Sequence, residues 1–576
     1  MKNIKKLLAL VLALAICAAF ALPALATADE AGKPASEGPF ILTMNTPQKG
    51  HTYEIYQLFK GNPAQDGENW ILANVQYGSS GWKMESSENT EMTAAKAAEK
   101  ISEFTTQELN EFVAGLDYEN MTAVDDSLKN ADDATTPLTW ELEGGYYVIK
   151  DTTELVEGSD DVVSGIMVRV VGPTDVTPKP TKPTPDKDVD KTDPIVVGGP
   201  YDYNVGDMIP YVLKATVPVK DLGQFVKPGD DKEKSTYNLT FRDYMEEGLL
   251  YLPSEADFHV YYTVNDERNE IDKAYYNINN SPAATGEKTP TFEVSLDLFK
   301  IIGTDTNNWS QFIDGDNIVI EVTYKALLEK VEQVGTGVKN EVTLVYPNNP
   351  YDDDQTGSSV SPPVDVPVYS FTLEGTKVDG KDETKVLSGA EFQLKDSDGN
   401  VIKFVDVDGQ FIRWSDTAFS GETPEGEGEN ATTYVYKVEG ENEDGSPKYV
   451  MEGENPKKYT VVETVTSDEN GKFNFGGLAA GTYTLVETKA PAGYNKLEKD
   501  ITVEVIAKID EETKKVTWTV AVNNEEQEGA AITVANNKGS TLPSTGGMGT
   551  TILYIVGAVL VVGAGVVLFT KRRMSN

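Results

Sequence analysis

Residues 317–324 read NIVIEVTY, a short run in which apolar side chains occupy every second position. Such alternation, with many β-branched and aromatic residues, is typical of a β-strand that buries one face. Similar runs recur along the chain, for example YVLKATV at 211–217 and KVTWTVAV at 515–522, and turns of the Asp-Gly and Asn-Gly type occur between runs. Short strands at this spacing predict a mainly β protein built of immunoglobulin-like β-sandwiches.

One segment near the N-terminus has a different period. Between Thr93 and Leu116 the apolar residues recur at helical spacing, which predicts one or two short helices. The residues with this spacing are Ala97, Ile101, Phe104, Leu109, Phe112 and Val113.

Two breaks divide the chain into three parts. Residues 173–194 alternate proline with Thr, Lys and Asp, and such a segment is extended and cannot join a central strand. Residues 348–367 are rich in Asn, Asp, Ser and Pro. We therefore expect three tandem domains, at 37–173, 187–350 and 366–538. A Pro-rich linker at 174–186 joins the first two.

The N-terminus has the composition of a secretory signal peptide. Lys2, Lys5 and Lys6 precede an apolar stretch, and small residues then fit a cleavage site near residue 28. Residues 1–28 are therefore expected to be removed on export. The only cysteine of the chain, Cys17, lies in this segment, so the exported protein is expected to hold no disulfide.

The C-terminus combines three features. Residues 542–547 read LPSTGG, residues 551–570 are apolar, and Lys and Arg follow. An apolar helix of about 20 residues spans a bilayer core of about 30 Å, and the basic end stays in the cytoplasm. This order resembles the cell-wall sorting signal of Gram-positive surface proteins. The resemblance implies that a sortase thiolate cleaves after Thr545 and transfers its carbonyl to an amine, with a motif of Leu542, Pro543, Ser544, Thr545 and Gly546.

Charge and composition exclude several functions. The formal net charge is −43 and the sequence pI is about 4.4, which excludes binding to nucleic acid because phosphate neutralisation needs a basic surface. With only His51 and His259, the chain has almost no material for zinc sites or His-based catalysis. Two Asp-rich stretches, 396–400 and 406–409, lack the glutamate of a calcium loop and favour hairpin turns. We expect no metal and no cofactor.

The third domain resembles the Cna-B domains of Gram-positive pilins and adhesins. The resemblance rests on LEGTKVD at 373–379, LSGAEFQL at 387–394, YTLVETKAPAGY at 483–494 and ITVAN at 532–536. It implies an intramolecular isopeptide bond between Lys377 and Asn536, assisted by Glu487. Burial lowers the pKa of a lysine and raises that of a glutamate, so a neutral amine could attack the Asn536 amide while a protonated acid donates a proton and ammonia leaves.

The other two domains carry looser resemblances. In the middle domain, NVGDMIPY at 204–211, RDYM at 242–245 and NEVTLVY at 340–346 resemble the Cna-A-like domain of shaft pilins. The implied trio is Lys187, Asp243 and Asn340, with Lys191 and Asn348 as alternatives for the lysine and the asparagine. In the first domain, YEIYQLF at 53–59 and GGYYVIKD at 144–151 resemble the N-terminal domain of shaft pilins. That domain has no such trio, and we expect no crosslink there.

The linker supplies the remaining motif. Residues 176–179, VTPK, resemble the pilin motif, whose lysine receives the sortase-bound chain; here Thr177 replaces the usual tyrosine and an upstream tryptophan is absent. Lys179 is the expected acceptor and Lys182 the alternative. Tension along such a fibre would cross the second and third domains and bypass the first. Each implied isopeptide bond is expected to join the first strand of its domain to the last.

These resemblances imply a secreted, cell-wall-anchored protein that is the major shaft subunit of a sortase-polymerised pilus. Expected partners are other copies of the chain, a pilin-type sortase, a housekeeping sortase with peptidoglycan, and accessory pilins or host surface molecules. The protein would be no enzyme, because its only chemistry is single-use crosslinking. The alternative is a wall-anchored adhesin or an accessory tip or base pilin, which needs no Lys179.

Overall fold

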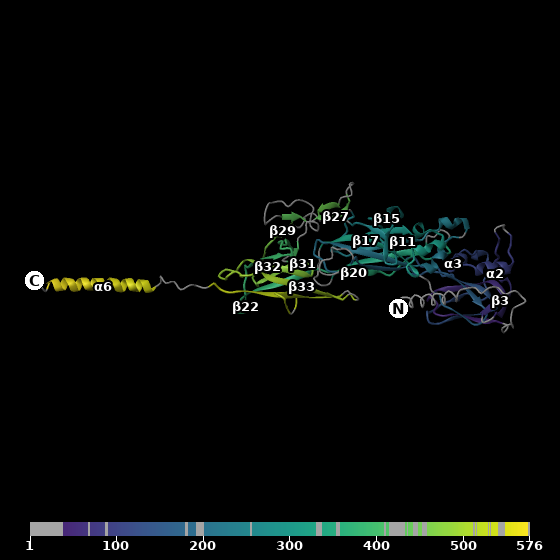
Figure 1. Ribbon diagram of the computed structural model, residues 1–576, viewed down its shortest axis with the longest axis horizontal. Helices are drawn as coiled ribbons and strands as arrows, with labels where there is room; N and C mark the ends of the chain where they lie inside the picture. The colour runs from purple at the N-terminus through teal and green to yellow at the C-terminus, as the bar shows by residue number, and fades with distance from the viewer. Residues whose placement is uncertain are drawn as a thin grey trace, which may run out of the picture.

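The described residues form a row of three β domains followed by one long helix, α6 (Figure 1). The computed structural model describes residues 38–573 except 67–68, 87–89, 179–181, 192–200, 228, 254–255, 330–336, 353–356, 408–409, 414–431, 435, 442–446, 452–457, 511–512, 514, 528, 530 and 540–547. The expected signal peptide at 1–28 lies outside these residues.

The first domain contains two sheets. One has the order β5-β1-β8, with β8 parallel to β1, and the other has the order β3-β2-β6-β7, with β4 beside β2. The strands are β1 (Phe40–Met44), β2 (Thr52–Asp66), β3 (Asn69–Tyr77), β4 (Lys129–Asn130), β5 (Leu138–Leu142), β6 (Gly145–Asp151), β7 (Gly165–Val170) and β8 (Thr174–Val176).

Two helices lie against the second of these sheets. α2 (Ala94–Ser102) follows Thr93 and α3 (Thr106–Ala114) follows Thr105, and each threonine side chain accepts a hydrogen bond from a backbone N–H of the first turn. Their apolar faces pack with residues of β2 and β6. The helical spacing in the sequence is thus confirmed. A short 3₁₀ turn, η1 (Tyr118–Asn120), follows.

The middle domain is a sandwich of two sheets. Their orders are β14-β13-β17-β10-β9, with β12 beside β17, and β15-β16-β11-β18-β19, with β20 beside β18. The strands are β9 (Thr184–Val189), β10 (Met208–Pro218), β11 (Asn238–Met245), β12 (Leu249–Leu250), β13 (His259–Val264), β14 (Glu267–Glu270), β15 (Tyr276–Asn279), β16 (Phe292–Asp297), β17 (Asn317–Leu328), β18 (Val338–Pro347), β19 (Ser358–Val360) and β20 (Val364–Val368). The helices are η2 (Val219–Phe225), η3 (Gly229–Lys234), η4 (Lys273–Tyr275), α4 (Leu298–Ile302) and η5 (Thr306–Gln311).

The third domain also has two main sheets. One has the order β22-β21-β31-β25-β24-β29-β26, with β36 beside β21, and the other β30-β23-β32-β33-β34-β35; β27 and β28 form a hairpin. The strands are β21 (Phe371–Asp379), β22 (Asp382–Val386), β23 (Glu391–Lys395), β24 (Phe404–Val407), β25 (Gln410–Arg413), β26 (Thr432–Tyr434), β27 (Tyr436–Glu441), β28 (Pro447–Met451), β29 (Lys458–Val462), β30 (Val465–Thr466), β31 (Lys472–Leu478), β32 (Gly481–Lys489), β33 (Ile501–Ile509), β34 (Val516–Val522), β35 (Glu525–Glu526) and β36 (Ala531–Asn536).

Strand pairing places the domain borders somewhat differently from the sequence-based ranges. β8 pairs with β1, so the first domain includes Val176, beyond the expected end at 173. β9 begins at Thr184, three residues before the expected start of the middle domain, and Pro185 is tolerated there because β9 is an edge strand. β20 pairs with β18, so the middle domain extends to Val368.

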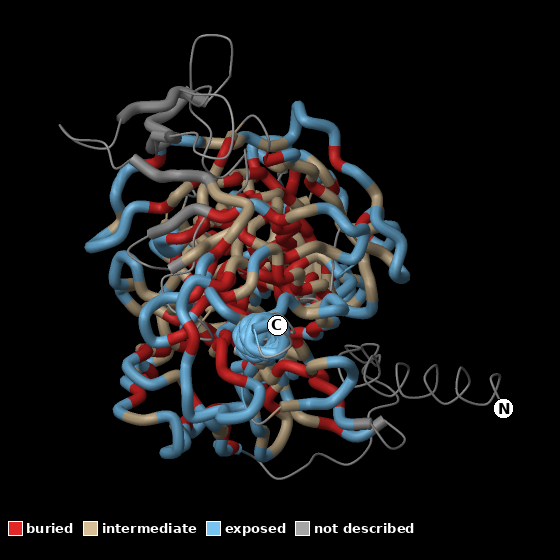
Figure 2. The backbone as a smooth tube through the Cα atoms, turned by 90° about the vertical axis from the view of Figure 1, so that its left-hand side faces the viewer, coloured by how far each residue is buried: buried red, intermediate tan, exposed pale blue. Residues whose placement is uncertain are grey.

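A buried apolar core continues from the middle domain into the third. At their junction the Val205 amide donates to the Gly477 carbonyl oxygen, and the Ala480 amide donates to Asp202 Oδ2. In the end-on view of Figure 2, buried residues lie inside a layer of exposed backbone. The middle and third domains therefore pack on each other directly.

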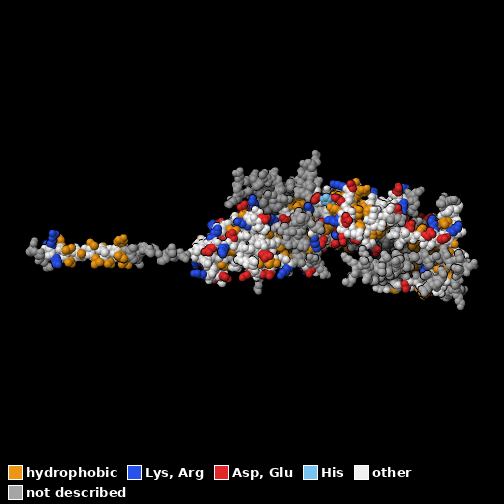
Figure 3. All heavy atoms as spheres, viewed as in Figure 1, with side chains coloured by type: hydrophobic (Ala, Val, Ile, Leu, Met, Phe, Trp, Pro, Cys, Tyr) orange, Lys and Arg blue, Asp and Glu red, His pale blue; other side chains and the backbone are white. Residues whose placement is uncertain are grey.

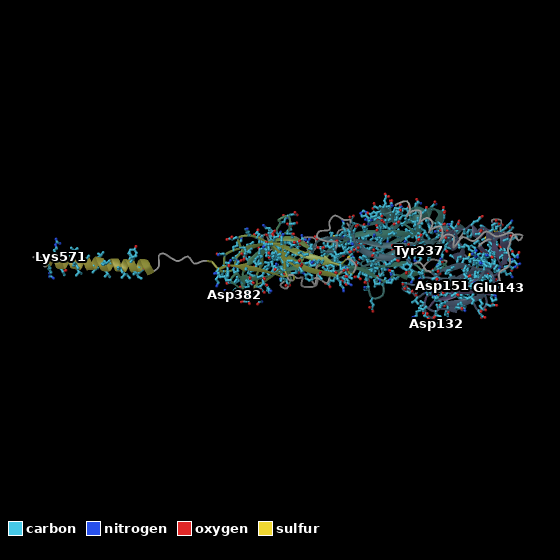
Figure 4. The ribbon with its side chains drawn as sticks, turned by 60° about the horizontal axis from the view of Figure 1, so that its bottom comes forward. Asp132, Glu143, Asp151, Tyr237, Asp382 and Lys571 are labelled. Carbon is cyan, nitrogen blue, oxygen red and sulfur yellow. The ribbon has the colours of Figure 1, made fainter. Side chains whose placement is uncertain are left out.

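The C-terminal helix α6 (Met548–Arg573) stands apart from the domains and has an exposed apolar surface (Figure 3). Residues Thr551–Arg573 are long and apolar enough to cross a membrane, with a mean hydropathy of 2.8. Lys571, Arg572 and Arg573 end the helix, as a cytoplasmic stop requires. Figure 4 shows Lys571 near one end of the molecule and Glu143 of the first domain near the other.

Candidate functional site

Three predicted residues meet in the core of the third domain. β21 and β36, the first and last strands of the domain, run parallel, and Lys377 lies opposite Val534. Since side chains two residues apart on a strand share a face, Asn536 points to the same side of the sheet as Lys377. Glu487 lies on β32 of the facing sheet. All three side chains are buried.

The distances suit an amide exchange. Lys377 Nζ lies 2.5 Å from Asn536 Oδ1 and 3.4 Å from Glu487 Oε1. Asn536 Nδ2 donates to the same Oε1 at 2.7 Å, while Glu487 Oε2 accepts from the Leu497 amide. The carboxyl group therefore touches both the attacking amine and the amide that would leave as ammonia. Burial lowers the pKa of Lys377 to about 8, against the opposing effect of Glu487, so a neutral amine is accessible near neutral pH.

The middle domain brings together the corresponding residues from its two sheets. Lys187 comes from edge strand β9, whereas Asp243 and Asn340 come from the neighbouring strands β11 and β18 of the opposite sheet. Lys187 Nζ donates to Asp243 Oδ2, and both side chains are fully buried. Asn340 is fully buried as well.

Protonation in this cluster is set mainly by burial. Burial lowers the pKa of Lys187 to about 8, although Asp243 acts in the opposite direction. Burial also raises the pKa of Asp243, against the effect of Lys187. Both shifts favour a neutral amine beside a protonated acid, which is the state that nucleophilic attack requires.

The alternatives for this trio lie elsewhere. Lys191 is exposed and pairs with Asp188 at 3.4 Å. Asn348 donates from Nδ2 to Ser359 Oγ at 3.0 Å, near the border with the first domain. Neither contacts Asp243, so the geometry favours Lys187 and Asn340.

One expectation about the middle domain was wrong. Asn340 does not lie on its last strand, because β19 and β20 follow β18 and pair with it. Val366 of β20 lies opposite Asn340 and leads directly toward β21. The sequence did not predict β19 and β20, because residues 348–367 are rich in Pro and Asp and resemble a linker. A Lys187–Asn340 bond would thus leave β19 and β20 outside its loop.

Tyr324 was not singled out from the sequence as a functional residue. Its hydroxyl donates to Asp243 Oδ2 at 2.7 Å and accepts from Asn340 Nδ2 at 2.7 Å. The alternation in 317–324 predicts that Tyr324 points inward, but only the packing of the two sheets places it beside the trio. Tyr211 stacks on it, with ring centroids 5.5 Å apart.

The proposed intersubunit residues are only partly described. Lys179, Thr545 and the rest of the sorting motif, Leu542 to Gly546, lie outside the described residues. Lys182 is described: its Nζ pairs with Asp160 at 3.2 Å and Asp161 at 3.8 Å, and the side chain is 28% exposed.

The first domain has a different buried cluster. Its buried polar residues within the described part are neither lysine nor asparagine: His51, Gln57, Ser80, Ser127 and Asp151. His51 Nδ1 lies 2.7 Å from Asp151 Oδ2, and Nε2 lies 3.8 Å from Asp161.

This histidine predicts a pH-dependent stability for the first domain. Burial opposes protonation, but the hydrogen bond to Asp151 and the charges of Asp151 and Asp161 outweigh it and raise the pKa of His51. A raised folded-state pKa gives stability that is full below the unfolded value and is lost as pH rises through the folded one. Calorimetry should therefore show a lower first-domain midpoint at pH 8 than at pH 6. His51→Gln should reduce this dependence, whereas His259→Gln, at an exposed site, should retain it; equal slopes in all three proteins would contradict the prediction.

Two protein-family models match the C-terminal part of the chain, one within the third domain and one at the C-terminal anchor. Residues 429–526 match the SpaA family, described as a prealbumin-like fold domain. Residues 535–576 match the LPXTG cell wall anchor motif. The second match covers the sorting motif and α6 together.

Relatives of the chain include surface and fimbrial proteins. It is 38% identical over 91 residues to the fimbrial subunit type 1 of Actinomyces viscosus, covering 16% of this chain and 15% of that protein. It is 25% identical over 280 residues to the trypsin-resistant surface T6 protein of Streptococcus pyogenes serotype M6, covering 45% of this chain and 49% of that protein. The chain thus aligns with at most about half the length of these relatives.

Among solved structures, the T6 backbone pilin of serotype M6 Streptococcus pyogenes, described as a modular three-domain protein, aligns with 88% of this chain and 100% of its own, at 15% identity and a TM-score of 0.43. The full-length major pilin SpaD of Corynebacterium diphtheriae aligns with 88% and 98%, at 18% identity and a TM-score of 0.37. The chain is thus a mainly β, cell-wall-anchored surface protein, and parts of its sequence are similar to a fimbrial subunit and to a streptococcal surface protein.

Proposed function

We propose that this chain is the major shaft subunit of a sortase-assembled pilus. A pilin-type sortase cleaves after Thr545 and passes its carbonyl to Lys179 of the next subunit, and a housekeeping sortase finally joins the fibre to peptidoglycan. The protein is a structural subunit and turns over no substrate. Accessory pilins and host surface molecules are further candidate partners.

The observation that carries this proposal is the location of the two buried Lys–acid–Asn clusters. Both lie between residues 179 and 545, where the fibre would carry tension. In the first domain, which lies before residue 179, the buried polar residues of the described part include no lysine and no asparagine. A fibre needs covalent support only in the domains that transmit load, and this distribution meets that need.

Each cluster is proposed to form one isopeptide bond. The Lys377 amine replaces the side-chain nitrogen of Asn536, with Glu487 moving the protons, and ammonia leaves. Lys187, Asn340 and Asp243 do the same in the middle domain. Each bond closes a loop of about 150 residues, which stabilises the folded domain by about 5 kcal/mol through loop-closure entropy.

The two clusters suit their mechanical role to different degrees. In the third domain the bond joins the first and last strands, so load passes from β21 to β36 through a covalent link and the domain cannot lengthen. In the middle domain load must also pass through β19 and β20, which only hydrogen bonds and packing hold. The middle domain is therefore the one expected to yield first under force.

A wall-anchored adhesin or accessory pilin is the second candidate, favoured by the same anchor match. The two differ in polymer formation. Wall material released by a muramidase should give a ladder of high-molecular-weight bands on a denaturing gel, each reactive with antibody to this chain. A single band near the monomer mass would favour the adhesin.

A further inference from the structure

The two clusters differ in how the acid reaches the asparagine. In the third domain Glu487 Oε1 accepts directly from Asn536 Nδ2 at 2.7 Å. In the middle domain Asp243 bonds to the lysine but makes no direct hydrogen bond to Asn340, although both side chains are described in full. Aspartate is one methylene shorter than glutamate, so its carboxyl group reaches less far. In the structure a third group, between the two, contacts both the carboxyl group and the amide nitrogen.

Tyr324 fills this gap. Its hydroxyl lies at 2.7 Å from both Asp243 Oδ2 and Asn340 Nδ2, and its ring is buried among Phe258, Phe292 and Tyr211. A phenol can donate one hydrogen bond and accept another at the same time. Asp243 Oδ1 and Asn340 Oδ1 have no hydrogen-bond partner in the described structure, whereas the hydroxyl of Tyr324 contacts both the acid and the amide nitrogen.

We propose that Tyr324 is a catalytic residue for the middle-domain crosslink and relays a proton from Asp243 to the leaving nitrogen of Asn340. This inference rests on the proposed isopeptide chemistry. The neutral Lys187 amine attacks Cγ of Asn340. Protonated Asp243 gives its proton to the Tyr324 hydroxyl as that hydroxyl gives its own to Nδ2, and the resulting carboxylate takes a proton from the attacking nitrogen. The Cγ–Nδ2 bond breaks, ammonia leaves, and both Asp243 and Tyr324 return to their starting forms.

The environment keeps the hydroxyl in the form that a relay needs. Burial, together with the charge of Asp243, raises the pKa of Tyr324 well above its usual range. The hydroxyl therefore stays protonated at neutral pH, and the proton moves through it in a concerted transfer. The third domain needs no such residue because Glu487 contacts the amine and the amide itself.

Tyr324→Phe tests the relay because it removes the hydroxyl and keeps the ring. The mature region, residues 29–545, would be expressed and its mass and Lys187-containing peptides followed over time. In this variant we expect the Lys377–Asn536 crosslink of the third domain to form completely, with loss of one ammonia. The Lys187–Asn340 crosslink of the middle domain should form about tenfold more slowly than in the wild type, or slower still. Tyr237→Phe removes another buried tyrosine hydroxyl of the same core, packed on Phe225 and Phe299, and should crosslink normally (Figure 4).

A second variant separates a relay from a purely structural role. Asp243→Glu in the Tyr324→Phe background lengthens the acid by one methylene, which extends its carboxyl group toward Asn340 on the neighbouring strand, and it should restore crosslinking. Normal crosslinking in Tyr324→Phe, or no recovery in the double variant, would overturn the relay. A wild-type protein that retains the middle-domain ammonia would overturn the proposed bond itself and the relay with it.

Discussion

Replacing Lys179 with alanine will abolish the ladder of covalent polymers and leave only monomer attached to the cell wall. The sortase acyl-enzyme needs an amine that can reach its carbonyl, and a linker side chain without one cannot extend the fibre. The C-terminal signal is untouched, so a housekeeping sortase can still transfer Thr545 to peptidoglycan. Immunoblots of muramidase-released material would measure the change, which is expected to be complete.

Lys182→Ala is the matched control, three residues further along the linker. Its amine pairs with Asp160 and Asp161, and it should therefore be less available as an acceptor. We expect its ladder to match that of the wild type. Persistence of the ladder in the Lys179→Ala, Lys182→Ala double variant would contradict the shaft proposal, whereas loss only in Lys182→Ala would move the linkage to that residue.

Glu487→Gln should produce the second large effect, on the stability of the third domain. The amide keeps the size of the carboxyl group but cannot shuttle protons between Lys377 and Asn536, so no bond forms. Losing a closure of about 150 residues removes about 5 kcal/mol. For a domain of this size that corresponds to a fall of about 10–20 °C in the unfolding midpoint. Scanning calorimetry of the mature region would measure it.

The control for this variant is Glu391→Gln, on a strand of the same sheet as Glu487. Glu391 pairs with Lys489 at the surface, and such pairs contribute at most about 1 kcal/mol. The midpoint of the control should hardly change, and its crosslink should form in full. If Glu487→Gln kept the wild-type unfolding midpoint and still formed the Lys377–Asn536 crosslink completely, the assigned role of the glutamate would be refuted.

The sequence predicted strands such as 211–217, 317–324 and 515–522 and one or two helices in the first domain, because alternation and helical spacing are local properties. The resemblance of the flanking motifs to Cna-B domains also grouped Lys377, Glu487 and Asn536. Local pattern could not reveal that β20 returns to pair with β18, since Val364 to Val368 reads as part of a Pro-rich break. Strand pairing decided that border.

Tyr324 shows the same limit inside the site. Alternation predicts that it points inward, and several tyrosines share that property. Its contact with Asp243 depends on how the sheet containing β17 packs on the sheet containing β11, a long-range relation that no single segment encodes. The sequence does show an aspartate in the middle domain where the third domain has a glutamate, which is one methylene longer. This difference becomes informative only once the distances in the two clusters are known.

The intact mass of the mature region tests the central claim most directly, because each proposed crosslink removes one ammonia. We predict a deficit of two ammonia molecules relative to the sequence mass, with peptide mapping that joins Lys187 to Asn340 and Lys377 to Asn536. A mass equal to that of the unmodified sequence, with both lysines recovered as free amines, would contradict the account.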